Sequence, residues 1–448
     1  MKKLSVLAAA CAAALFSLNS NAANTTVFDN VRIFDGSGTP TVPNGRVVIE
    51  DQKITEVGPK DSVKVPAGAK VLDYSGKTVI PGIISNHTHL GQYDATISTT
   101  PYNQETIQRQ LLQYTSYGVT SVTSLGVNGK LFYDLQAKLH SGELPGADIF
   151  GADRGIGVPK GAPPVNVGAD QLDRPATPEE ARDAVRGAAA RHANLIKLWL
   201  DDFQGAKLVK MEPAIYKAVI DEAHKNNLKV VAHIYYLQDA KDLINAGADI
   251  LGHGVRDQRI DQEFIDLVRT HGTWYIPTLT VDEAFYRFAE QPYLLDRPEV
   301  RRALNAKLLA QYESDAWRKN QLASPALATW HKGFDNNKYN TKTLVDAGLK
   351  VGFGTDSGAM PLRVPGYAEY HELELLVEAG LSPVQALTLA TSKAAELLNL
   401  SDRGVLRKGK NADIVVVDGD PATDIANLKR ISAVWRLGKE MPLKVAPY

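Results

Sequence analysis

Residues 78–90 read TVIPGIISNHTHL, an apolar run that passes directly into polar residues. This pattern is typical of a buried strand that ends at a functional or capped position. His87 and His89 lie two residues apart, so both imidazoles face the same side of the predicted strand. A His-x-His pair by itself is more often structural than functional, so its meaning depends on the rest of the chain.

Other apolar stretches also carry a polar residue at or near their ends. They are Leu195–Leu200 with Lys197, Lys229–Ile234 with His233, Ile250–Gly252 followed by His253, and Val351–Gly354 followed by Asp356. Each has an ordinary explanation when taken alone, such as a core histidine, a snorkelling lysine or a helix N-cap. Six such residues at the ends of strands are not expected by chance, and together they predict one shared site.

Strands and amphipathic helices alternate through the middle of the chain. Further strands are expected at Val119–Leu125, Ile149–Gly151 and Trp274–Pro277, and helices at Glu105–Tyr117, Pro178–His192, Ala214–Asn226, Gln238–Ala246 and Gln262–His271. Eight strand–helix units over this length predict an α/β fold, a (β/α)₈ TIM barrel, whose strands end at a common mouth. The long connections Arg154–Pro175 and Val281–Tyr339 both follow barrel strands, so we expect them to overhang that mouth.

Short strands separated by Asp, Gly, Pro and Asn occupy both ends of the chain, from Thr25 to Ile80 and from Ala412 to Trp435. This punctuation is typical of β-sandwich material. We therefore predict a small β-sandwich domain built from residues 23–80 and 404–448, with the barrel at 81–403.

Residues 1–22 resemble a cleaved signal peptide. Lys2 and Lys3 precede an apolar run from Leu4 to Leu18, which is shorter than the ~20 residues needed to span a bilayer. Small residues then predict cleavage near Ala22 and a periplasmic or secreted protein. Cys11 is the only cysteine and would leave with this segment, so any metal ligands must be His, carboxylate or Lys.

The charge balance excludes several classes of partner. The chain has 50 basic and 51 acidic residues, which gives no basic excess for nucleic acid or an anionic membrane surface. We expect a small-molecule substrate and no membrane association after cleavage. Whether the chain forms a homo-oligomer is left open.

Taken together, the motifs resemble those of the amidohydrolase superfamily of metal-dependent hydrolases. TVIPGIISNHTHL, LIKLWL, VVAHIYY, LGHG and VGFGTDSG follow the order of its metal-binding motifs, and residues 379–400 and 403–421 match its C-terminal tail. The likeness covers nearly the whole mature chain and points to imidazolonepropionase-like, prolidase-like and ochratoxinase-like amidases. Ser85 departs from the pattern, because the superfamily more often has Asp at this position.

The resemblance implies a centre of two divalent metal ions, with Zn²⁺ best suited to the ligands. His87 and His89 would bind the more buried ion with Asp356, and His233 and His253 would bind the second. Carboxylated Lys197 would bridge the two ions. A hydroxide between the metals would attack the substrate carbonyl, and Asp356 would take its proton and pass it to the leaving group.

Substrate contacts are predicted from position. Tyr235 lies two residues beyond His233, shares its inward face, and could hydrogen-bond a developing oxyanion; packing at the barrel rim is the alternative. Arg154, at the end of the third strand, could bind a substrate carboxylate. Asp201, Asp202, Arg363 and His371 are further residues expected at the mouth, where such charges are commonly solvated or cap helices.

Several functions remain open. An amide or dipeptide hydrolase is the first interpretation, and a lactonase, carbamate or ester hydrolase could use the same centre. A deaminase fits less well, because such relatives lack the strand-four lysine and place a glutamate soon after the fifth-strand histidine. A periplasmic binding or metal-storage protein could display His and Asp, but it gives no reason for Lys197 among them.

Overall fold

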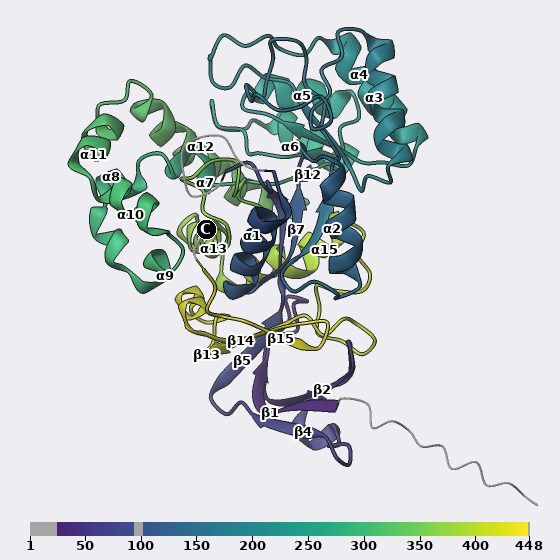
Figure 1. Cartoon of the computed structure of the whole chain (residues 1–448), viewed down its shortest axis with the longest axis vertical. Helices are drawn as coiled ribbons and strands as arrows, with labels where there is room; N and C mark the ends of the chain where they lie inside the picture. Colours follow the sequence, from purple (N-terminus) through teal and green to yellow (C-terminus); the bar gives the residue numbers. More distant parts are fainter. Residues whose placement is uncertain (1–24, 94–101, 447–448) are drawn as a thin grey trace, which may run out of the picture.

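The computed structural model describes residues 25–93 and 102–446. It shows an α/β fold in which a small β domain lies below a larger body of strands and helices (Figure 1). The predicted signal peptide lies outside the described residues. No helix in the two described ranges combines the length and apolar character needed to cross a membrane.

The β domain joins both ends of the chain. Antiparallel pairing of β5 with β13 connects the N-terminal strands to the C-terminal ones, and the strand order is β15-β14-β13-β5-β1-β2-β3, with β4 beside β1. The strands are β1 (Thr25–Ile33), β2 (Val42–Glu50), β3 (Lys53–Pro59), β4 (Lys70–Asp73), β5 (Lys77–Pro81), β13 (Ile414–Asp418), β14 (Ile431–Arg436) and β15 (Lys439–Met441). They form one eight-stranded sheet, so the two separate sheets of the predicted sandwich are not what the described strands show.

The strands of the larger body form two parallel sheets. One contains β6 (Ile83–Thr88), β7 (Val119–Ser124) and β8 (Asp148–Gly151); the other contains β9 (Ile196–Trp199), β10 (Val230–His233), β11 (Ile250–Leu251) and β12 (Trp274–Tyr275). Single bridges connect Ile156 with Leu198, Tyr275 with Val351, and Thr88 with Ser357. The described strands therefore do not make one continuous closed sheet, and the expected strand at Val351–Gly354 is reduced to a bridge.

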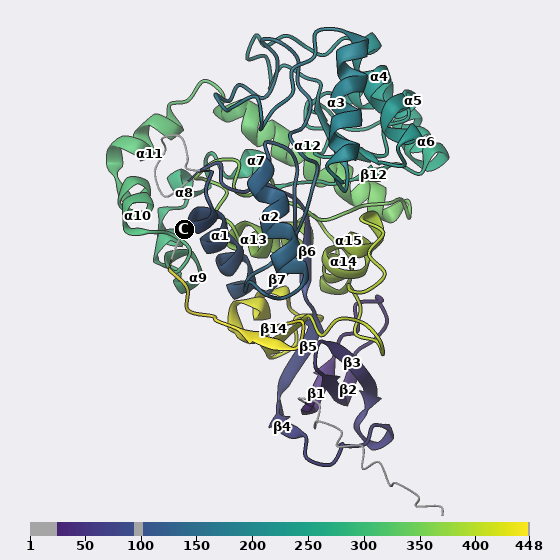
Figure 2. The ribbon, with the colours of Figure 1, turned by 45° about the vertical axis from the view of Figure 1, so that its right-hand side comes forward.

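The five predicted helices are confirmed within two residues. They are α1 (Gln104–Ser116), α3 (Pro178–Ala190), α4 (Pro213–Lys225), α5 (Leu237–Asn245) and α6 (Gln262–His271). Asn103 and Thr177 start α1 and α3 by accepting a hydrogen bond from the backbone N–H three residues on. Gly272 ends α6 with φ of 65°, a conformation that suits glycine. The sequence interpretation missed α2 (Lys130–His140) and α13 (Tyr367–Glu378), which also cover the strands (Figure 2).

The connection predicted at Val281–Tyr339 is helical. It contains α7 (Thr280–Glu283), α8 (Arg287–Glu290), α9 (Pro298–Arg301), α10 (Ala306–Glu313), α11 (Asp315–Leu322) and most of α12 (Leu327–Asp346). These helices form a lobe on one side of the larger body (Figure 1). We call residues 280–346 the helical lobe.

A buried cluster of charges ties the β domain to the larger body. Arg403 contacts the Asp148 carboxylate of β8 at 2.8 Å and the Ser121 hydroxyl of β7 at 2.9 Å. Arg436 of β14 contacts the other Asp148 oxygen at 3.3 Å. Burial raises the pKa of Asp148, but His140 and the two arginines more than offset it and hold that pKa at about 2.

Arg403→Met should therefore destabilise the protein strongly. The change removes one compensating charge from Asp148, which is 1% exposed, and breaking a buried ion pair in this way costs about 3–5 kcal/mol. Thermal unfolding of the purified variant measures the effect. Arg407→Met is the control, since Arg407 is exposed and 3.8 Å from Asp35, an interaction worth about 1 kcal/mol or less. Equal shifts for the two variants would contradict the structural role of Arg403.

Candidate metal centre

Four histidines, a lysine and an aspartate meet at the C-terminal ends of the parallel strands. His87 lies in β6 and His89 just after it, His233 ends β10, and His253 follows β11. Lys197 comes from β9, and Asp356 follows the bridge residue Val351 on the segment between α12 and α13. All six side chains are buried. The structure thus brings together every residue predicted as a metal ligand.

The imidazoles form a continuous row. Ring centroids are 5.5 Å apart for His89 and His87, and 4.4 Å apart both for His87 and His253 and for His253 and His233. Asp356 Oδ1 lies 2.9 Å from His89 Nε2 and 3.2 Å from His87 Nε2. The carboxylate therefore lies at the end of the row that contains His87 and His89.

Partners on the outer side orient two of these rings. His87 Nδ1 lies 2.5 Å from the Gly252 carbonyl oxygen, and His253 Nδ1 lies 2.9 Å from the Thr278 hydroxyl. A carbonyl can only accept, so His87 Nδ1 donates and leaves its Nε2 as a lone pair that faces the site. His87 Nε2 has no hydrogen-bond partner among the described residues.

Burial keeps the imidazoles neutral. It is the main cause that lowers the pKa of His87, His89 and His253 well below the usual value, with Lys197 and neighbouring cationic groups adding to it. The pKa of His233 falls to about 4, although Asp201 opposes the shift. Neutral imidazole is the form that binds a metal ion.

Lys197 is the most unusual member of the cluster. Its side chain is fully buried, and its Nζ has no hydrogen-bond partner in the part of the chain that the structure describes. Burial lowers the pKa of this amine to about 7, with Asp201 acting in the opposite direction. An uncompensated ammonium here would be costly, so the site favours a neutral or modified amine.

This donor set fits a metal centre. His87, His253 and Asp356 each offer a ligand atom, and these atoms lie within 4.8 Å of one another. Two orphaned buried nitrogens, His87 Nε2 and Lys197 Nζ, lie in the same cluster. Imidazole nitrogens with one carboxylate are typical of Zn²⁺ and of other first-row divalent ions.

Asp201 adds a buried carboxylate beside His233. Its Oδ1 lies 3.4 Å from His233 Nε2 and accepts a hydrogen bond from Phe203 N at 2.9 Å, whereas its Oδ2 has no partner among the described residues. Asp201 lies four residues beyond Lys197. The sequence placed it only at the mouth, so its contact with a candidate ligand comes from the structure.

Glu369 of α13 supports the opposite end of the row. Its carboxylate accepts hydrogen bonds from the hydroxyls of Ser85, Thr355 and Ser357, at 3.2, 2.5 and 2.6 Å. These bonds connect β6 with the segment that carries Asp356. The superfamily more often has Asp where this chain has Ser85. Here Glu369 supplies a buried carboxylate nearby, on a helix that no sequence motif identified.

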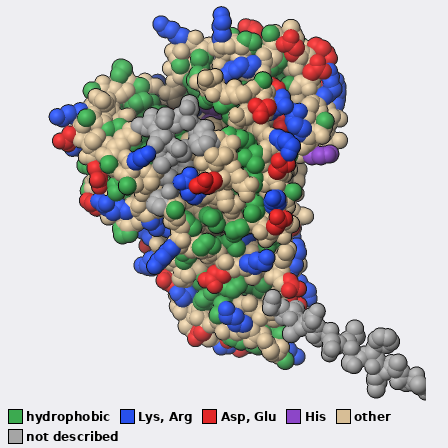
Figure 3. Space-filling view, in the orientation of Figure 1, with side chains coloured by type: hydrophobic (Ala, Val, Ile, Leu, Met, Phe, Trp, Pro, Cys, Tyr) green, Lys and Arg blue, Asp and Glu red, His purple; other side chains and the backbone are tan. Residues whose placement is uncertain are grey.

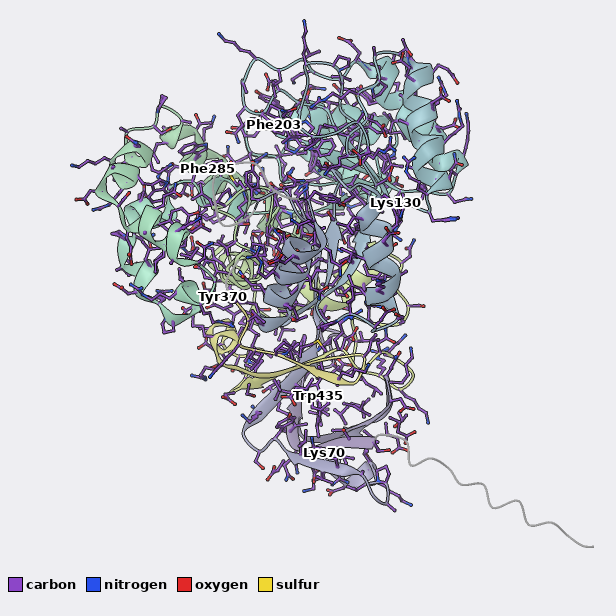
Figure 4. All side chains as sticks on the ribbon, in the orientation of Figure 1. Lys70, Lys130, Phe203, Phe285, Tyr370 and Trp435 are labelled. Atoms are coloured by element: carbon purple, nitrogen blue, oxygen red, sulfur yellow. The ribbon has the colours of Figure 1, made fainter. Side chains whose placement is uncertain are left out.

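A cavity of about 560 Å³ opens onto the cluster. His89, His233, His253 and Asp356 line it on the strand side. Phe203 from the segment after β9 and Phe285 from the helical lobe line other walls, and both are labelled in Figure 4. Figure 3 shows the surface hollowed between the helical lobe and the upper part of the molecule.

Tyr235 lines this cavity, as its position beside His233 suggested. Burial raises its pKa to about 12, so the phenol stays protonated and can donate a hydrogen bond at neutral pH. The Arg256 guanidinium lies over its ring at 5.0 Å. The sequence interpretation missed Arg256, although a cation three residues beyond His253 was a usable signal.

The other residues expected at the mouth divide into two groups. Arg363 lines the cavity. Arg154 does not: it pairs with Asp173 at 3.3 Å and lines a separate cavity with Arg174 and Arg191, so its expected contact with substrate is not carried further. Asp202 accepts a hydrogen bond from the Tyr236 hydroxyl, and His371 lies between Glu283 and Glu374; neither lines the cavity.

Comparisons with known proteins show the family of this chain. A family model described as the amidohydrolase family matches residues 78–441. Ochratoxinase from Aspergillus niger is 25% identical over 465 aligned positions, which span 94% of this chain and 87% of the relative. A 5-methylthioadenosine/S-adenosylhomocysteine deaminase from Bacillus cytotoxicus is 24% identical over 397 positions, spanning 84% and 81%. A Xaa-Pro dipeptidase structure with bound methionine superposes with a TM-score of 0.73 at 22% identity, covering 93% of this chain and 99% of that one, and supports the fold.

Proposed function

Because the chain belongs to the amidohydrolase family and is a hydrolase acting on carbon–nitrogen bonds, we propose that it is an exported two-metal enzyme that cleaves an amide bond of a small molecule or dipeptide-like substrate. The observation that carries this proposal is Lys197, a fully buried amine without a hydrogen-bond partner among the described residues, next to four neutral imidazoles. A binding or storage protein has no use for an amine in that position.

The residues divide into two ligand sets. His87, His89 and Asp356 would hold the more buried ion, and His233 and His253 the second, with carboxylated Lys197 between them. Contacts of Asp356 with His87 and His89 support the first set, and the close approach of His253 and His233 supports the second. Bound Zn²⁺ ions would lower the pKa of water toward ~7 and polarise a carbonyl.

The protein's own groups would then position the substrate and move protons. Asp356 would accept a proton from the attacking water and deliver it to the leaving nitrogen. Tyr235 keeps its proton at neutral pH and lines the same cavity, so it can hydrogen-bond oxygen charge that develops on the carbonyl. The apolar walls around Phe203 and Phe285 exclude water from the bond that breaks.

We also propose that the two parallel sheets belong to one (β/α)₈ barrel. The single bridges occur at the three gaps around the ring, between β8 and β9, β12 and the Val351 segment, and that segment and β6. The β domain would complete the molecule as a sandwich-like support. This arrangement explains why all the ligands emerge at one mouth.

Ester, lactone and carbamate hydrolysis remain alternatives, because each would use the same metals, base and oxyanion donor. Deamination, the reaction named for one relative, is less well supported. Ile234, Tyr235 and Tyr236 follow the fifth-strand histidine here, without a glutamate, and Lys197 fits a bridged centre.

Metal removal tests the proposal. The purified mature protein should hold about two divalent ions per chain by elemental analysis, and chelation should abolish hydrolysis, with recovery after adding Zn²⁺. A panel of N-acyl amino acids, dipeptides, lactones and aryl esters identifies the bond cleaved. Full activity in a metal-free preparation would end the two-metal proposal, and activity confined to esters or lactones would end the amidase assignment.

Export predicts a shortened chain. Expressed in a Gram-negative host, the protein should be recovered from the periplasm with its first residue near Ala23, measured by N-terminal sequencing or intact mass. Lys2→Glu with Lys3→Glu removes the basic start of the segment and should reduce export. Cytoplasmic protein beginning at Met1 would contradict the signal peptide.

A further inference from the structure

Arg363 is a buried cation in the wall of the candidate active-site cavity. It lies between Asp356 and α13, is 8% exposed, and lines the cavity together with Met360. Its Nη1 contacts Asp356 and its Nη2 contacts the Met360 sulfur at 2.9 Å. Its Nε has no hydrogen-bond partner among the residues that the structure describes.

The charge of Arg363 lacks an anion of its own. Asp356 is the only carboxylate within 4 Å of its guanidinium in the described ranges, and Asp282 acts on it from farther away. The Asp356 carboxylate also belongs to the metal ligand set. Once Asp356 binds a metal ion, little of its negative charge is left to compensate the guanidinium. A buried cation without a counter-ion is costly, so this position favours an anion supplied from the cavity.

Arg256, the other arginine in this cavity, is already compensated. Its Nη1 pairs with the buried Asp282 at 3.1 Å, and its Nη2 donates to the Ile234 carbonyl at 3.3 Å. Its guanidinium also lies over the ring of Tyr235. These contacts make Arg256 a positioning residue for Tyr235 and leave Arg363 as the arginine with capacity for an external anion.

An apolar surface lies directly beside Arg363. The guanidinium carbon is 5.8 Å from the ring centroid of Phe285, and Phe285 stacks on Trp330 at 4.5 Å with 12° between the ring planes. Both rings come from the helical lobe and line the cavity. An anionic group and an apolar group on one molecule would therefore meet complementary surfaces here.

We propose that Arg363 binds the carboxylate of the substrate and that the Phe285–Trp330 pair binds its apolar side chain. The preferred substrate is then an N-acyl derivative of an apolar amino acid, held so that its amide bond faces the metal centre. This inference rests on the proposed amide hydrolysis. It predicts that the enzyme prefers such acids over neutral amides and ureas, which would leave the charge of Arg363 uncompensated.

Paired probes test the role of the carboxylate. The metal-loaded full-length mature enzyme is assayed with N-acetyl-L-phenylalanine and with N-acetyl-L-phenylalaninamide by acetate release. Binding of both compounds is measured by calorimetry. A hydrogen-bonded contact to a charged group predicts about a 10- to 150-fold preference for the acid in kcat/KM and in affinity. The preference should disappear in Arg363→Gln, because kcat/KM and affinity for the acid fall to the level measured for the amide with the same variant.

Two further variants sharpen the outcome. Arg363→Lys should keep part of the preference, because it retains the charge but loses the planar fork. Arg154→Gln removes an arginine outside this cavity and should keep all of it. Metal content is measured for every variant, since Arg363 also contacts Asp356.

Equal binding of the acid and the amide by the wild-type enzyme would overturn the inference, as would a preference that survives Arg363→Gln. Loss of metal from both Arg363 variants would also overturn it, because Arg363 would then serve to hold Asp356. If the acid binds preferentially through Arg363 but neither probe is hydrolysed, the amidase proposal fails while the carboxylate site stands.

Discussion

Lys197→Arg is expected to lose the paired metal centre and to lower turnover by about 10³-fold or more. The carboxylated form arises when the neutral amine attacks CO₂, which forms an N–C bond and releases a proton. Burial holds the pKa of this amine at about 7, so the reactive neutral form dominates above that pH. A guanidinium cannot undergo this reaction and stays charged. At ~4 Å and an effective dielectric near 20, each contact of that charge with a metal-borne unit charge costs about 4 kcal/mol.

Metal content by elemental analysis is the direct measurement, because it does not depend on a known substrate. Carbon-13 NMR of protein loaded with labelled bicarbonate would show the carbamate in the wild-type chain alone. Lys229→Arg is a matched control, since Lys229 precedes the neighbouring strand β10 and donates to the Leu397 carbonyl at 2.8 Å, away from the histidines. Short carboxylic acids should restore part of the activity of Lys197→Ala. Wild-type metal content together with a wild-type rate in Lys197→Arg would show that Lys197 is not the bridging ligand.

Asp356→Asn is expected to lower turnover by about 10²–10⁴-fold, the usual contribution of a general base. Asparagine keeps a side-chain oxygen that can bind a metal ion beside His87 and His89, but its amide cannot act as the base that accepts the proton. The substitution is also conservative for the backbone: Asp356 has φ of 60°, a left-handed conformation that Asn adopts readily. The loss should therefore appear in kcat at the pH optimum.

A parallel variant separates this effect from a general cost of the substitution. Asp346→Asn removes an exposed carboxylate at the end of α12, paired with Lys342, and should leave kcat unchanged. Asp356→Glu should restore some proton transfer while shifting the carboxylate by one methylene. A kcat for Asp356→Asn within about threefold of the wild type would assign the base to another group.

Much of the secondary structure was predictable because its signals are local. The helices at 104–116, 178–190 and 262–271 carry their own N-caps and apolar spacing, and they begin and end close to where the pattern predicts. α2 has Gly129 at its N-cap and therefore lacks a side-chain cap that would mark its start. α13 is buried on most sides and therefore lacks a clear amphipathic pattern. The Val351 strand was overestimated, because an apolar run does not determine whether a neighbouring strand pairs along its full length.

The candidate metal ligands were also readable from the chain. His87, His89, Lys197, His233, His253 and Asp356 interrupt apolar strand ends, and parallel strands bring their C-terminal ends together whatever the loops do. Periodicity and order therefore indicated which six side chains meet. The residues that surround a substrate were not determined in this way, since Arg154, Arg256 and Arg363 look alike in sequence.

Only the tertiary structure distinguished these arginines. Arg154 follows a strand end but turns to Asp173, Arg256 is neutralised by Asp282 from the helical lobe, and Arg363 is left beside Phe285 and Trp330. Asp173 lies 19 residues from Arg154, Asp282 lies 26 residues from Arg256, and the two aromatic residues lie at most 78 residues from Arg363. No local pattern specifies the course of the loops between these partners. Strand ends converge because backbone hydrogen bonding forces them to. The charge balance of a cavity depends on which long connections fold over it, and that is set by packing between distant segments.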